Sequence, residues 1–269
     1  MVFNLNMKAL IPYFTFMLAN VTLAQSGIIH YDKLLNNVAG ELWATPQALY
    51  FDTEQSLFIE LGKGKKLTEA YKEGEMDREG IIRSSKKMPS KGFYDYYYID
   101  KKQNEILFKE QIAETTYEIK NTLEPIIWVL YDEQKDIEGF SCQKATTTFR
   151  GRDYTAWFTS DIPVDIGPWK LNGLPGLIMD VIDATGKYRF RISKIDLKPD
   201  QKILQENLKK PNQKNTKNFE VYKNAVKNAF DDQMAIAQSR IPKGAKLVFK
   251  GPDCTTCPDP DNYLIERYK

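Results

Sequence analysis

The three cysteines carry the most reactive side chains of this chain. Cys254 and Cys257 form a Cys-x-x-Cys pair between two prolines, whereas Cys142 stands alone. A redox-active pair usually opens a helix, whose N-terminus lowers the pKa of a thiol, and the Pro-Asp-Pro that follows here is a poor helix start. We therefore expect Cys254 and Cys257 to form a small-loop disulfide or to remain adjacent thiols. Cys142 should pack on a strand or pair with one of them. A metal site that recruits Asp253 or Cys142 is the weaker alternative.

Two arginines flank a glycine in the run Arg150-Gly151-Arg152, and aromatic residues follow it. Guanidinium groups at the tip of a hairpin can hold a carboxylate or a phosphate. The alternative is a hairpin whose charges face water while an aromatic residue packs inside. The loop before the next strand adds two aspartates and a tryptophan. The candidate residues at the rim of a ligand or partner site are Arg150, Arg152, Tyr154, Trp157, Asp161, Asp165 and Trp169.

Several classes of enzyme are disfavoured by what the sequence contains. The single histidine, His30, falls on the first expected strand, and one histidine rules out most Ser-His-Asp triads and multi-histidine metal sites. The aspartates at 161, 165, 180 and 183 have no spacing that marks a catalytic pair, and we interpret them as solvated surface acids. No glycine-rich phosphate motif is present. We predict no catalytic residue, no cofactor and no metal site, and a binding protein in preference to an enzyme.

A compact turn motif, Gly173-Leu174-Pro175-Gly176-Leu177-Ile178, precedes an apolar run. Pro175 presets φ for the second position of a β-turn, and we expect Gly176 to take the positive φ that a type II turn needs at the third. The residues from 177 to 182 are apolar and β-branched, which is typical of a buried strand. The motif is thus interpreted as a structural corner, with the loop from 161 to 176 facing a ligand as the functional alternative.

The pattern of apolar residues predicts a mainly β protein of the α+β type. Short alternating segments with brief connections indicate a large curved antiparallel sheet or half-open barrel. One long C-terminal helix, 219–238, should pack against the sheet, because Tyr222, Val226, Phe230 and Met234 recur every fourth residue. The charged stretch 62–92 is interpreted as a solvated excursion. The expected strands are 27–34, 48–52, 56–61, 93–100, 105–112, 115–121, 126–132, 145–149, 152–160, 177–182, 188–192 and 246–250.

The ends of the chain indicate export. Residues 1–24 have the form of a secretory signal peptide, with a short basic start, an apolar centre and small residues before Gln25. Residues 25–269 then form a single β-rich domain that ends in a Pro- and Asp-rich Cys-x-x-Cys tail, 251–269. No segment of the mature chain is long enough to span a membrane. The net charge of +2 argues against non-specific nucleic-acid binding, which requires a large basic field.

Several short motifs together resemble the GLPGLI family, which is named after the hexapeptide 173–178. The resemblance is carried by 137–145, by Phe149-Arg150-Gly151-Arg152, by 154–159, by Ile162-Pro163, by Gly167-Pro168 and by that hexapeptide, and it reaches to about residue 195. It implies an exported protein of a Gram-negative bacterium, often encoded near TonB-dependent outer-membrane receptors, with no assigned activity. No catalytic residue therefore carries over. The strand pattern is also similar to the half-barrel of periplasmic lipoprotein carriers, a likeness of fold alone.

Taken together, these observations predict an exported cell-envelope protein with a non-enzymatic binding role. The bound molecule would be an apolar small molecule or lipid inside a concave sheet, or an envelope protein such as one of the outer membrane. The alternatives are an exported hydrolase or thiol-redox enzyme, and an accessory to a TonB-dependent receptor. The protein would be periplasmic, associated with the outer membrane, or secreted.

Overall fold

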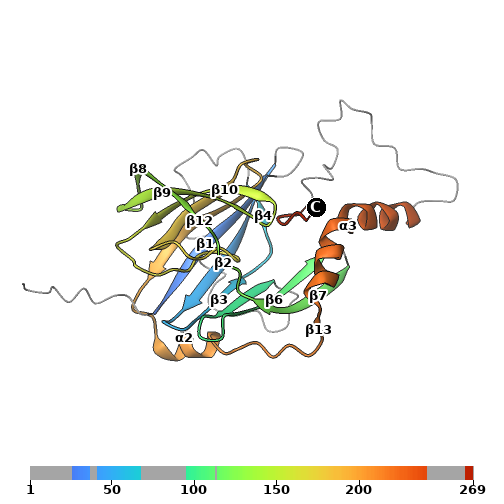
Figure 1. Cartoon of the computed structure of the whole chain (residues 1–269), viewed down its shortest axis with the longest axis horizontal. Coiled ribbons are helices and arrows are strands. Elements are labelled where there is room, and N and C mark those ends of the chain that lie inside the picture. Colours follow the sequence, from blue (N-terminus) through green and yellow to red (C-terminus); the bar gives the residue numbers. More distant parts are fainter. Residues whose placement is uncertain (1–25, 37–40, 68–94, 113, 241–263, 269) are drawn as a thin grey trace, which may run out of the picture.

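The computed structural model describes residues 26–36, 41–67, 95–112, 114–240 and 264–268. Within these ranges the chain forms one open sheet of 13 strands and two helices (Figure 1). The predicted β-rich fold with a C-terminal helix is therefore confirmed. The strands are β1 (Gly27–Asn36), β2 (Leu42–Phe51), β3 (Gln55–Glu60), β4 (Lys65–Lys66), β5 (Tyr96–Asp100), β6 (Glu105–Ile112), β7 (Thr115–Thr122), β8 (Val129–Ile137), β9 (Phe140–Phe149), β10 (Arg152–Thr159), β11 (Leu177–Asp183), β12 (Tyr188–Asp196) and β13 (Thr216–Lys217).

Strand β1 lies in the middle of the sheet and joins two antiparallel halves. On one side the order is β2, β3, β5, β6, β7 and β13, and on the other side it is β12, β11, β10, β9 and β8, while β4 pairs with β2. All these pairs are antiparallel except the short pairing of β13 with β7. The two ends of the sheet do not meet, so β8 is the terminal strand on its side.

The sheet has an apolar core on each face, because successive side chains of a strand point to opposite sides. Ile29 and Tyr31 belong to the larger core, to which nearly every strand contributes. Ile28 belongs to the smaller core on the other face, which is completed by Leu204 and Leu208. Leu204 comes from a short helix, α2 (Gln201–Asn207), which the sequence analysis did not predict.

Helix α3 (Phe219–Ser239) has nearly the bounds predicted from its four-residue period. The side chain of Asn218 caps its start by accepting a hydrogen bond of 2.7 Å from the backbone N–H of Glu220. Tyr222, Val226 and Ala229 are buried, and the helix packs on β6 and β7. The buried positions stop at Ala229, so the first half of the helix covers the sheet.

Most predicted strands are present, with shifted ends. The segment 126–132 is displaced as a whole, because β8 runs from Val129 to Ile137 through a polar stretch that has no clear alternation, and β2 begins six residues before its predicted start. Trp128, just before it, instead donates a hydrogen bond of 2.9 Å from its indole Nε1 to the carbonyl of Asn172. The predicted strand 246–250, most of the stretch 62–92 and the cysteines of the tail lie outside the described residues. No helix in the described ranges is long and apolar enough to cross a membrane.

Candidate functional site

The Arg150-Gly151-Arg152 turn holds the C-terminal segment 264–268. Arg152 donates from Nε to the carbonyl of Ile265 at 2.8 Å, and from a terminal nitrogen to the carbonyl of Leu264. The backbone N–H of Arg267 donates to the carbonyl of Arg150 at 2.9 Å. The two predicted guanidinium groups thus do bind carbonyl and hydroxyl oxygens, but these belong to the chain itself.

Gly151 is required at this turn for two reasons. Arg150 and Gly151 have φ values of 50° and 75°, as the two-residue type I′ turn between β9 and β10 needs. A Cβ at position 151 would also collide with the backbone carbonyl of Arg267. The absence of a side chain therefore lets the C-terminal segment lie directly on the hairpin.

Arg150 and Arg152 are held by charges and rings as well as by this segment. The Nη1 of Arg152 lies 2.9 Å from Oδ2 of Asp183, and both side chains are almost fully buried. Arg150 makes an ion pair of 3.2 Å with Glu124 and donates to the hydroxyl of Tyr268. Its guanidinium also lies over the ring of Phe219, 4.8 Å from the centroid. These contacts fix both guanidinium groups in place.

Lys170 is the most unusual side chain in the interior, because it is a lysine that is only 2% exposed. Its Nζ lies 3.1 Å from Glu110 and also contacts Glu266 of the C-terminal segment. The same Nζ lies 3.6 Å from the centroid of the Phe108 ring and 3.3 Å from the hydroxyl of Tyr222. A buried ammonium group is tolerated here because carboxylates and aromatic faces replace its water.

Glu110, on β6, is the acceptor at the centre of this group. Tyr97 donates its hydroxyl to Glu110 at 2.7 Å, Tyr222 donates to the other oxygen, and Trp169 approaches at 3.5 Å through its indole nitrogen. Burial alone would raise the pKa of Glu110, but Lys170 and the two tyrosine hydroxyls lower it overall. The carboxylate is therefore held ionised, and its hydrogen-bonding capacity is used by the protein.

The loop between β10 and β11 brings Trp169 and Lys170 into the interior. Trp169 has a φ of 58° and packs against the rings of Phe149 and Tyr154, with centroids 5.8 Å and 6.2 Å away. Gly173, with a φ of 87°, donates its N–H to the carbonyl of Asp165 at 2.9 Å and closes the loop. The loop is a folded part of the core.

The predicted role of Gly176 was wrong. It does not have a positive φ; the positive φ in this motif belongs to Gly173. Gly176 is needed for a different reason, since a Cβ there would collide with the carbonyl oxygen of Thr159 on the neighbouring strand. The motif as a whole leads into the buried strand β11, as expected.

The seven predicted rim residues separate into two groups. Arg150, Arg152, Tyr154 and Trp169 lie around the C-terminal segment and the Lys170 loop. Trp157 lies apart from this site, under Lys135, whose Nζ is 4.3 Å from its ring. Asp161 is exposed, and the half-exposed side chain of Asp165 pairs with Lys101 at the surface.

Two acids interpreted as surface residues are in fact buried, so that prediction was wrong for both. Asp183 pairs with Arg152 and accepts the backbone N–H of Tyr188 at 2.8 Å. Asp180 makes a two-pronged contact with Arg189, at 2.8 Å and 2.7 Å. Burial is possible because each carboxylate has a guanidinium partner on the sheet.

The sequence analysis missed the central residues Tyr97, Glu110, Lys170, Tyr222 and Glu266. One signal was present, because Glu110 follows Ile106 and Phe108 at two-residue intervals and precedes Ile112. An acid within the apolar face of a strand is expected to be buried and paired. The partners of Glu110 come from distant parts of the chain, so no local pattern identifies them.

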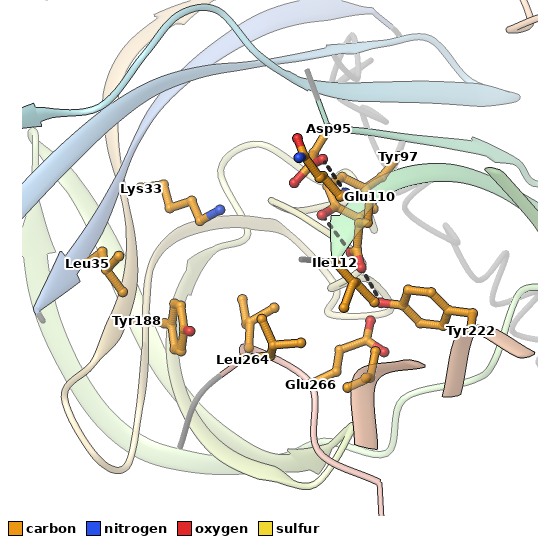
Figure 2. Close-up of a pocket in the computed structure, with 13 residues that line it drawn as sticks. Lys33, Leu35, Asp95, Tyr97, Glu110, Ile112, Tyr188, Tyr222, Leu264 and Glu266 are labelled. Atoms are coloured by element: carbon orange, nitrogen blue, oxygen red, sulfur yellow. Dashed lines mark hydrogen bonds between the residues drawn. The ribbon is translucent and has the colours of Figure 1, made fainter. Parts of the chain in front are cut away.

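A cavity of about 350 Å³ lies beside this group (Figure 2). Its charged lining comes from Lys33, Asp95, Glu110 and Glu266, and most of the other lining residues are apolar or aromatic. In Figure 2 the side chains of Lys33 and Glu266 extend toward the cavity from opposite sides, and Asp95 and Glu110 lie together. The apolar and aromatic lining residues are Leu35, Tyr97, Ile112, Tyr188, Tyr222, Val226, Leu264 and Ile265.

The remaining chemistry-bearing residues form no second centre in the described ranges. Cys142 is a buried free thiol on β9, and burial raises its pKa to about 11. His30 is half-buried, and burial lowers its pKa. No group of three or more potential metal ligands occurs among the described residues.

Comparisons with known proteins give a short family match and remote structural likenesses. A family model described as "Protein of unknown function (Porph_ging)" matches residues 150–180, which include the Arg150-Gly151-Arg152 turn and the Lys170 loop. No curated protein matches the chain. Two structures of PNGF-II, in the C2 and P21 space groups, are 17% and 16% identical, with TM-scores of 0.47 and 0.46. Both alignments cover 76% of this chain, which spans about a third of the length of PNGF-II (33% and 34%). An uncharacterized conserved protein from Thermus thermophilus is 8% identical, with a TM-score of 0.33, over 84% of this chain and 91% of that one.

Proposed function

We propose that the protein is an exported binding protein of the cell envelope that recognises a second protein through its terminal strand β8. The observation that carries this proposal is a run of exposed apolar side chains at the start of that strand. Ile127 is 84% exposed, Val129 54%, Leu130 48% and Tyr131 39%. Side chains of this kind, adjacent in sequence and open to water, are typical of an interaction site.

The position of β8 makes these residues accessible to an added strand. β8 is the last strand on its side of the sheet, so one of its edges has no neighbouring strand among the described residues. Its pairing with β9 is also interrupted between Leu130 and Gln134. An extended peptide can pair with such an edge through its backbone, while side chains on alternate positions give specificity.

The chemistry of the edge indicates what the partner segment contains. Apolar residues would lie opposite Val129 and Leu130. Further along the strand, Asp132, Glu133 and Asp136 give β8 an acidic character, although Glu133 is paired with Lys144. The partner is therefore an extended segment with apolar residues opposite the start of β8 and basic residues opposite its acidic part.

An apolar ligand inside the sheet is the less supported of the two expected occupants. The loop 161–176 fills much of the inner face with Ile162, Ile166, Trp169 and Leu171, all of them buried. The remaining cavity has four charged residues in its lining. A thiol-redox activity at Cys142 is disfavoured as well, because reactive cysteines are exposed and have lowered pKa values.

Export and the envelope location rest on the signal-peptide pattern and the resemblance described above. The same resemblance suggests an outer-membrane receptor as the first partner to test. Mass spectrometry of the protein purified from an envelope fraction should find Gln25 as the first residue. An intact N-terminus in the cytoplasmic fraction would contradict export.

The binding proposal is tested by placing a photoreactive amino acid at position 131 of the full chain in the native envelope. We expect a crosslink to one extended segment of one envelope protein, and a synthetic peptide of that segment should bind the purified chain. The V129K/L130K double variant should lose peptide binding at least tenfold. The matched control is I203K/V221K, which changes two equally exposed apolar residues on the helices and should bind normally. Equal loss in both variants, or a crosslink only to a second copy of this chain, would refute the proposal.

A further inference from the structure

The cavity beside Glu110 has a charged end, formed by Asp95 and Glu110, toward which Lys33 extends. Leu35, Tyr188 and Leu264 line the other end, where Glu266 lies beside Leu264 (Figure 2). A volume of about 350 Å³ falls within the range of sites for small molecules. A ligand that fits this cavity therefore has a charged group and an apolar body.

The charges around the charged end favour a cation. Lys33 is already occupied by Glu60, which its Nζ approaches at 3.4 Å, and Lys170 lies between Glu110 and Glu266. Each lysine thus has its own carboxylate partner. With Asp95 ionised, the four carboxylates of Glu60, Asp95, Glu110 and Glu266 outnumber the two lysines, which leaves an excess of negative charge around the cavity.

Asp95 is the acid that remains available to a ligand. Its Oδ1 accepts the backbone N–H of Gln111 at 3.1 Å, and no described residue donates to its Oδ2. Glu110, by contrast, has tyrosine hydroxyls on both oxygens. We propose that this cavity binds a small organic cation, an amine whose ammonium group pairs with Asp95 and whose apolar body lies against Tyr188 and Leu264.

The surroundings of Asp95 support this assignment. Lys33 from β1, Glu60 from β3, and Glu110 and the Gln111 N–H from β6 all face it, and Tyr97 lies nearby. Burial and the two glutamates raise its pKa to about 7, and Lys33 and the Gln111 N–H offset this only in part. A bound ammonium group would supply the missing countercharge, and it would displace the proton from Asp95.

The test uses the purified full chain and three probes of matched shape, which are benzylamine, benzyl alcohol and benzoate. Isothermal titration calorimetry at pH 8, where Asp95 is ionised, should give a Kd for benzylamine at least tenfold lower than for the other two. Between pH 6 and pH 8 the affinity for benzylamine should rise about tenfold, because the ionised fraction of a group with a pKa of about 7 rises by that factor. The affinity for benzyl alcohol should stay constant.

The Asp95→Asn variant keeps an acceptor for the Gln111 N–H and should lose the preference for benzylamine together with its pH dependence. Asp232→Asn, which removes an exposed aspartate from α3, is the matched control and should bind benzylamine like the native chain. Equal binding of all three probes, tightest binding of benzoate, or an unchanged preference in the Asp95→Asn variant would overturn the proposal. Even if the Asp95→Asn variant does not fold, the relative affinities of the native chain for the three probes test whether the cavity prefers an amine. Because no partner protein is present, the result is independent of the function proposed for β8.

Discussion

Replacing Lys170 by Met should cost the protein more stability than any surface charge substitution. Met has nearly the length of Lys and leaves the aromatic contacts in place, so the change removes chiefly the charge. The loss leaves Glu110 and Glu266 buried without their cation. Removing one partner of a buried ion pair typically costs about 3–5 kcal/mol. Glu110 keeps the hydroxyls of Tyr97 and Tyr222, so we expect about 3 kcal/mol, near the lower limit.

This loss is measured by urea unfolding followed by tryptophan fluorescence, with an unchanged m-value as the sign of an unchanged fold. For a domain of this size the midpoint of thermal unfolding should fall by about 6–12 °C. The matched control is Lys144→Met, since Lys144 pairs with the exposed Glu133 and such a pair contributes about 1 kcal/mol or less. Glu266→Gln in the Lys170→Met background should cost less than it does alone, because it removes an unpaired buried charge. A loss for Lys170→Met no larger than for Lys144→Met would refute the reasoning.

Two further substitutions test other parts of the structure. Asp32 is buried with no hydrogen-bond partner for either carboxylate oxygen, and burial raises its pKa from 3.8 to about 6. The folded state therefore binds a proton on Asp32 more tightly than the unfolded state does. The resulting stabilisation is fully present below pH 4 and is lost as the pH rises through 6. At 1.36 kcal/mol per pKa unit, the loss amounts to about 3 kcal/mol. Asp32→Asn should flatten the stability profile between pH 4 and 6 and raise the free energy of unfolding at pH 7, and a variant that is less stable at every pH would contradict this. Gly151→Ala should release the C-terminal segment, because the new Cβ collides with Arg267, and carboxypeptidase should then digest the chain faster. Gly139→Ala is the control, because Gly139 has a φ of 82° and open space around it, so the change imposes similar backbone strain without a collision. Equal digestion of the two variants would show that the contact with Arg267 is unimportant.

The sheet and the long helix could be predicted because their signals are local. Alternating apolar residues mark β7 and β12, and the four-residue period marks α3. Helix α2 escaped prediction because its seven residues bury only Leu204, which is too little for a period to be recognised. The bounds of β8 escaped because a terminal strand with both faces largely exposed has no alternation to read.

The candidate site was harder to predict than the fold, because its contacts join distant parts of the chain. Glu110 and Lys170 are 60 positions apart, and the Lys170–Glu266 contact spans 96 positions. A sequence pattern can indicate that Glu110 is buried, but the identity of its partner depends on how the sheet curves and where the C-terminal segment lies. The arginines of the turn were predicted to bind an anion from outside the chain, whereas the partners seen in the structure are a buried aspartate, a glutamate and the chain's own carbonyl groups.

These contacts change what the two motifs of the resemblance mean for function. The Arg150-Gly151-Arg152 turn and the loop that leads to Gly173 use their charged groups on the C-terminal segment and on neighbouring acids. Residues committed in this way hold Leu264, Ile265 and Glu266 at the cavity without lining it themselves, and they leave little capacity for a ligand. The two proposed binding positions are Asp95 in the cavity, whose Oδ2 accepts no hydrogen bond from a described residue, and the exposed apolar residues of β8. The turn and the loop thus fix the C-terminal segment that lines the cavity, and the residues of the proposed binding positions lie outside both motifs.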